Sequence, residues 1–147
     1  MRLMIDFENR LHSDIDIAHL EKISSYLTPR SLELIITDDN DIQTINKTYR
    51  NIDKATDVLS FPMEIMPGIP LDLLPLGSII ISYDYVKNGA DKFGHNNQNE
   101  LSLLFIHGLL HLLGFDHEID SGEMRQEERR IINEFDLPNS LIVRTQQ

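Results

Sequence analysis

Three histidines fall within the eleven residues HGLLHLLGFDH, residues 107–117, and their spacing restricts the fold more than any other feature of the chain. Side chains four positions apart lie on one face of an α-helix, so His107 and His111 can direct their imidazoles at one metal ion. Gly114 follows where a left-handed residue can end the helix, and the turn would bring back His117 as a third ligand. Three protein ligands, with a fourth position left for water, are typical of a catalytic zinc site.

The sequence around these histidines is apolar nearly all round, which is typical of a buried helix. Two core histidines satisfied by hydrogen bonds are the alternative, but buried imidazoles are costly without partners, and a metal supplies one. The spacing equals that of the metzincin proteases, H-E-x-x-H-x-x-G-x-x-H. Gly108, however, stands where those proteases carry the glutamate that acts as general base. A metzincin mechanism is therefore not available to this chain.

Composition restricts the class of protein further. The chain has 147 residues, the length of one ordinary domain, and no cysteine, which excludes a disulfide scaffold and cysteine-ligated metal sites. The net charge of −11 argues against nonspecific binding of nucleic acid, so any RNA contact must rest on a local basic patch. Asp6 and Glu8 stand where a signal peptide would need an uninterrupted apolar core. The most apolar run, residues 101–115, is too short to span a bilayer. We expect a cytoplasmic protein with no membrane partner and no DNA partner.

Hydrophobic periodicity predicts the element order β-α-β-α-β-β-α-α-α. Strands are expected at residues 2–8, 31–37, 58–61 and 76–82. Helices are expected from residue 13 or 14 to 27, at 41–49, at 83–93, at 101–113 after a cap at residue 96 or 97, and at about 122–135. The prediction is a single α+β domain over residues 1–147, with a small mixed four-stranded sheet, about five helices and a zincin-like metal helix at the centre. The three remaining histidines, at positions 12, 19 and 95, are expected at the surface.

Two stretches, YRNIDKATDVLSFP (residues 49–62) and HGLLHLLGFDH, resemble the signatures of the YbeY family, and the order of elements and the length resemble that family over essentially the whole chain. These are bacterial metal-dependent endoribonucleases involved in 16S ribosomal RNA 3′-end maturation and late 70S ribosome quality control. The resemblance implies that His107, His111 and His117 bind one zinc ion per chain. It also implies that Arg50 matches the family's functionally important arginine. The implied partners are ribosomal RNA, the 30S subunit and assembly factors.

An arginine beside a metal-activated water suits the binding of phosphate and of the extra charge of a phosphoryl transition state. Lys47, Arg50 and Lys54 form the densest basic cluster of the chain, although Arg50 alone would be interpreted as a solvated loop residue. Asp57 either orients a histidine ligand or caps a turn. Asp116 either contacts the metal water or is an ordinary turn aspartate.

Ser78, in LGSIIIS, departs from the family pattern, which usually has an aspartate at this position. If that acidic group shapes the site, this chain does without it or recruits another residue. The expected function is a single-strand-specific, zinc-dependent endoribonuclease, with either water or the RNA 2′-hydroxyl as nucleophile. Two alternatives stay open: a zinc metallopeptidase, against which Gly108 counts, and a non-catalytic ribosome-assembly factor with a structural zinc. The cleavage site and the oligomeric state are left open.

Overall fold

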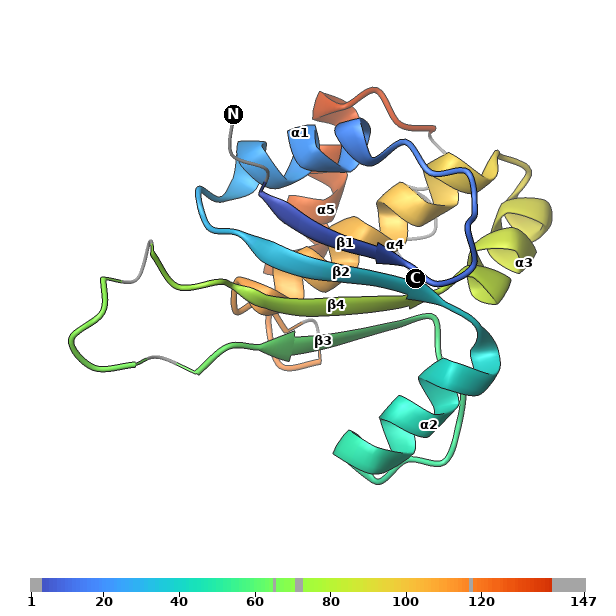
Figure 1. Ribbon diagram of the computed structural model, residues 1–147. Helices are drawn as coiled ribbons and strands as arrows, with labels where there is room; N and C mark the ends of the chain where they lie inside the picture. Colours follow the sequence, from blue (N-terminus) through green and yellow to red (C-terminus); the bar gives the residue numbers. More distant parts are fainter. Residues whose placement is uncertain (1–3, 65, 71–72, 117, 139–147) are drawn as a thin grey trace.

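A computed structural model describes residues 4–64, 66–70, 73–116 and 118–138. Four strands form one sheet in the order β1-β2-β4-β3, as Figure 1 shows. The strands are β1 (Ile5–Asn9), β2 (Leu32–Thr37), β3 (Val58–Pro62) and β4 (Gly77–Ser82). The helices are α1 (Ile17–Leu27), α2 (Asp39–Arg50), α3 (Tyr83–Phe93), α4 (Asn97–Leu112) and α5 (Glu123–Glu134). Strands β1, β2 and β4 are parallel and β3 runs antiparallel at the edge. The predicted α+β class and mixed sheet are confirmed.

The two faces of the sheet are covered unequally, because alternate residues of a strand point to opposite faces. One face packs on α1, α4 and α5, which lie on the same side in Figure 1, and forms the main core. This face is made chiefly of Leu32, Leu34, Ile36, Ile79 and Ile81. The other face carries Ile35, Leu59 and Ile80, on which Ile42 of α2 packs at one end. Farther along this second face Glu33 is exposed. We call this second face of the sheet the open face.

Helix α4 lies at the centre of the main core. Eleven of its sixteen residues are buried, which accounts for its apolar sequence. Its last residue is Leu112, and Gly114, two positions on, adopts the left-handed conformation that the sequence predicts, with a φ of +102°. The Gly114 N–H donates to the carbonyl of His111 and the Phe115 N–H to that of Leu110, both at 3.0 Å. These two bonds satisfy carbonyls that the last helical turn leaves unpaired.

Two local expectations differ from the structure. Helix α1 begins after Asp16, whose side chain accepts from the His19 N–H at 3.2 Å. The earlier cap candidates lie in a loop, because the Asn9 side chain bonds both backbone groups of Ser13. The expectation of a surface His95 is wrong. Its side chain is 3% exposed, and its Nε2 lies 2.7 Å from the buried Glu100 carboxylate. None of the helices in the described ranges has the length and hydropathy to cross a bilayer.

Candidate metal and phosphate site

A pocket of about 320 Å³ lies between α4, the edge strand β3 and the C-terminal end of α2. Its lining consists of Arg50, Asp57, Val58, Ser60, Pro62, His107 and His111. The fold thus brings the predicted arginine to the two predicted helical histidines, although more than fifty residues separate them in sequence. His117 lies outside the described residues. We call this cavity the metal pocket.

The two histidines face each other across the pocket. Their Nε2 atoms are 3.2 Å apart, and their ring centroids are 4.7 Å apart with planes at 78°. Such a separation arises when one nitrogen donates a hydrogen to the other, or when both bind one ion. Two nitrogens bound at 2.0–2.1 Å to a tetrahedral zinc ion lie roughly 3.3 Å apart, so this pair fits one edge of a zinc site. Within the described ranges no group of three histidine, cysteine or acidic side chains could hold a metal.

A residue that the sequence analysis missed, Glu128 of α5, contacts the first histidine. Its Oε1 lies 3.0 Å from His107 Nδ1, and its side chain is 5% exposed. A neutral imidazole carries one N–H, and donation from Nδ1 to this carboxylate leaves the Nε2 lone pair directed at His111. The sequence does carry a signal for Glu128. It falls on the buried face of α5 between Met124 and Ile132, where a charged residue needs a partner.

Arg50 is the last residue of α2, not a loop residue, and it is exposed. The helix ends there because Asn51 adopts a left-handed conformation, with φ 59° and ψ 33°, which asparagine tolerates better than most residues. Among the described residues Arg50 makes no hydrogen bond or ion pair, so its guanidinium is available to a ligand. Lys47 Nζ, in contrast, lies 3.9 Å from the Asp53 carboxylate. Among the described residues, Arg50 is thus the one arginine or lysine that lines the pocket; Lys54 is exposed and does not line it.

The surroundings of Gly108 explain why this helix carries no protease glutamate. A Cβ at Gly108 would stand 3.0 Å from Ile79, 3.1 Å from Val58 and 3.2 Å from Ser60. Position 108 therefore faces the sheet, and its carbonyl accepts a hydrogen bond from Ser60 Oγ at 3.0 Å. A longer side chain here would push the sheet away from the helix.

The two aspartates with open roles make local contacts. Asp57 lines the metal pocket, and its Oδ1 accepts from the N–H of Val58 at 2.8 Å and from Thr56 Oγ1 at 3.4 Å. Asp116 Oδ1 accepts from the N–H of Glu118 at 3.0 Å. These contacts agree with the turn interpretation of both residues.

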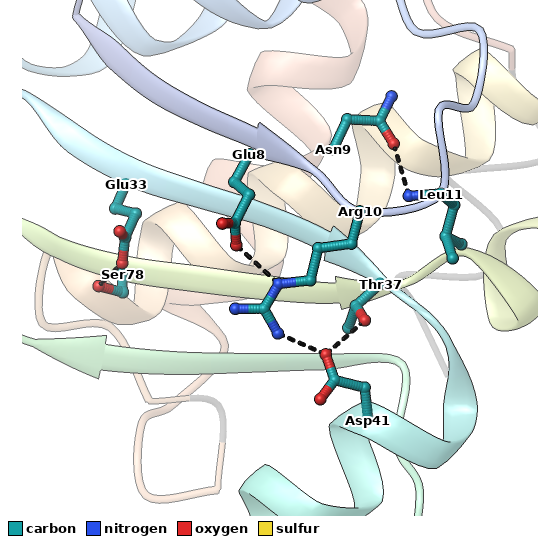
Figure 2. A network of polar contacts seen from close by, with 8 residues as sticks. All are labelled: Glu8, Asn9, Arg10, Leu11, Glu33, Thr37, Asp41 and Ser78. Carbon is teal, nitrogen blue, oxygen red and sulfur yellow. Dashed lines mark hydrogen bonds and ion pairs between the residues drawn. The ribbon is translucent and has the colours of Figure 1, made fainter.

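A carboxylate from the neighbouring strand lies beside Ser78. Glu33 and Ser78 are partners in the register of β2 and β4, and Ser78 Oγ donates to Glu33 Oε1 at 2.9 Å. Both residues are labelled in Figure 2. Farther along the open face, the Arg10 guanidinium bonds Glu8 and Asp41. These two hydrogen bonds, which Arg10 donates to Glu8 and Asp41, raise the pKa of Arg10, and the one to Glu8 has the larger effect.

Comparison with known proteins extends over nearly the whole chain. A sequence profile of the family described as Endoribonuclease YbeY matches residues 6–136. Proteins named Endoribonuclease YbeY from Nautilia profundicola and Sulfurimonas denitrificans are 56% and 57% identical to this chain over 143 residues, which cover 97% of it and 99% of each relative. The solution structure of TM1509 from Thermotoga maritima matches with a TM-score of 0.58 at 26% identity, over 90% of this chain and 89% of that one. The chain belongs to the endoribonuclease YbeY family.

Proposed function

We propose that this chain is a zinc-dependent endoribonuclease that cuts single-stranded ribosomal RNA, in 16S 3′-end maturation and in 70S quality control in the cytoplasm. The observation that carries the proposal is the metal pocket, where two imidazole nitrogens 3.2 Å apart share one cavity with an exposed arginine. The nuclease activity named for the relatives supports it.

Each residue has a distinct part in this proposal. His107, His111 and His117 would hold the zinc ion, which when bound lowers the pKa of a water molecule or polarises a phosphate oxygen. Arg50 binds the scissile phosphate through paired N–H groups and stabilises the charge that develops on it. Glu128 keeps the His107 proton on Nδ1, which leaves Nε2 free for the ion.

The acidity of the chain has a consequence for the substrate. With a net charge of −11, the protein as a whole repels RNA phosphates, so attraction has to come from local basic groups such as Arg50 at the end of α2. We therefore propose that the 30S subunit and its assembly factors bring the RNA to the metal pocket.

The test compares purified wild type with His111→Ala, Arg50→Ala and, as a control, Arg129→Ala, which removes an exposed arginine on α5. Wild type should carry close to one zinc ion per chain and cut single-stranded RNA. His111→Ala should lose both zinc and cleavage. Arg50→Ala should keep its zinc and melting temperature while cleavage falls about 10²- to 10³-fold, as on loss of one charge-stabilising donor. Arg129→Ala should behave as wild type.

The products identify the nucleophile, since 2′,3′-cyclic phosphate ends indicate attack by the RNA hydroxyl and linear phosphates indicate water. Cleavage that persists unchanged in Arg50→Ala and His111→Ala would assign the activity to a contaminant and favour the assembly factor with a structural zinc. Peptide cleavage by wild type that disappears in His111→Ala would favour the peptidase, which the packing of Gly108 disfavours.

A separate experiment tests the proposed role of Glu128. Glu128→Gln keeps the size of the side chain but removes the charge that holds the His107 proton. Zinc affinity, measured by competition with a chelator, should fall about 10- to 100-fold. An unchanged affinity would mean that Glu128 only fills the core.

A further inference from the structure

The edge strand β3 separates two pockets. Its alternate residues point to opposite faces, so Ser60 and Pro62 line the metal pocket while Phe61 lines a second pocket on the open face. This second pocket has a volume of about 430 Å³ and is floored by Ile35 and Ile80. We call it the open-face pocket. Strand β3 lies between the two cavities.

The end of α2 reaches both pockets with consecutive residues. Arg50 lines the metal pocket, and Tyr49 lines the open-face pocket. Tyr49 is largely open to solvent, with 73% of the residue exposed. Its ring centroid lies 5.7 Å from that of Phe61, with planes at 61°. The pair therefore presents aromatic surface to solvent directly beside the arginine, and such surfaces stack the bases of single-stranded RNA.

The charges of the open-face pocket favour a neutral ligand with a polar edge. Its charged lining residues are Arg10 and Glu33. Figure 2 shows the Arg10 guanidinium already held by the carboxylates of Glu8 and Asp41, so it does not offer an uncompensated charge to a phosphate. The Glu33 carboxylate, bonded to Ser78, can accept hydrogen bonds from the N–H groups at the edge of a base.

We infer that the open-face pocket binds a nucleobase of single-stranded RNA, stacked on Tyr49 and Phe61, next to the phosphodiester held by Arg50. This inference rests on the proposed function. An RNA strand would cross the edge of β3, with its phosphate on one side and the adjacent base on the other. A base within a duplex stays paired and stacked and cannot enter the open-face pocket, so this pocket supplies a physical basis for single-strand specificity.

The test measures binding of short single-stranded RNA by fluorescence anisotropy, under conditions in which a gel shows the RNA intact. Tyr49→Ala should weaken binding roughly 5- to 100-fold, the range found when a stacking aromatic is removed. Tyr49→Phe keeps the ring and should bind within about twofold of wild type. The matched control is Tyr85→Ala, which removes an exposed tyrosine from α3 and should change nothing.

A second measurement separates stacking from a structural effect. RNA probes with a single abasic sugar are prepared, one for each position of the strand. At one position the missing base should weaken binding to wild type but should cause no further loss of affinity for Tyr49→Ala. That coupling identifies the stacked base. Coupling at no position, or equal binding by Tyr49→Ala and Tyr85→Ala, would overturn the inference and leave the pocket to another occupant, such as a protein loop. A wild type that neither binds nor cuts RNA would instead refute the proposed function.

Discussion

Replacement of Gly77 by alanine tests how tightly β3 is held against β4. Gly77 opens β4 and pairs with Pro62 at the end of β3. Its φ is +149°, and a Cβ there would stand 2.3 Å from the Phe61 carbonyl oxygen and 2.9 Å from the Cα of Pro62. Both are backbone atoms, so no change of rotamer can relieve the contact. We expect Gly77→Ala to force the end of β3 away from β4.

The magnitude follows from two contributions. A side chain at positive φ costs about 1–2 kcal/mol. Overpacking costs a further 1–3 kcal/mol, roughly, when neighbours must move. The expected loss is therefore about 2–5 kcal/mol of a free energy of unfolding that is typically about 5–15 kcal/mol. Gly68 provides the control, since its φ is +84° and a Cβ there would meet nothing within 4 Å. Gly68→Ala has only the first contribution. In both variants the less flexible unfolded chain offsets about 0.4–1 kcal/mol, so the difference between them is unaffected.

The assay is urea unfolding monitored by circular dichroism. The unfolding free energies of the two variants are compared with the same m value, the slope of free energy against urea concentration. Phe61 and Pro62 line the two pockets, so RNA cleavage by Gly77→Ala should fall as well. A loss of stability no larger than that of Gly68→Ala would refute the reasoning, because it would mean that the backbone of β3 yields without cost.

Three further predictions concern charge and metal. A hydrogen bond from Thr37 lowers the pKa of Asp41, so its contribution to stability is present above the unfolded pKa of about 3.9 and lost as pH falls through the lower folded value. Asp41→Asn should therefore be less stable than wild type in urea at pH 7, by a difference that shrinks as pH falls below the unfolded pKa, and a difference independent of pH would contradict this. His95→Ala removes a partner of the buried Glu100 and should cost about 1–3 kcal/mol in the same assay, while a variant within error of wild type would show the contact to be dispensable. Zinc at 100 times its Kd should add about 2.7 kcal/mol to the free energy of unfolding and roughly 5–10 °C to the melting temperature, reversibly with a chelator. The same zinc should not shift His111→Ala, and an equal shift would place the ion elsewhere.

Local signals in the sequence predicted most elements of the fold. Helix α3 has the predicted bounds, because it begins after a buried strand and ends at Gly94 in a left-handed conformation. The apolar run of β4 and the glycine end of α4 are equally local. The order of strands is not local. It depends on β3 folding back to the edge of β4, and on α2 packing at one end of the open face. These are contacts between distant segments that periodicity does not encode.

The residues of the site likewise fall into those that local sequence predicts and those that depend on contacts between distant segments. The spacing of His107 and His111 is a property of one helix, so the sequence could predict that their imidazoles converge. Arg50 was assigned by resemblance, since only the fold brings the end of α2 to α4. Glu128 and Glu33 act through partners on other elements, His107 and Ser78, so their contacts require helix packing and strand register. A charged residue on an apolar helix face was the signal available for Glu128.

The position of α4 and α5 after all four strands has a consequence for synthesis of the chain. The last strand is complete at Ser82, but the helices that cover the main face of the sheet extend to Glu134. At about 5–20 residues per second, roughly 3–10 s pass between these points on the ribosome. During this interval α1 is the only one of the three helices that pack on this face to have been made, so part of the apolar surface of Leu34, Ile36, Ile79 and Ile81 stays uncovered. The nascent chain thus exposes apolar surface until α4 and α5 are complete, and the contact between His107 and Glu128 can form only after Glu128 has been added.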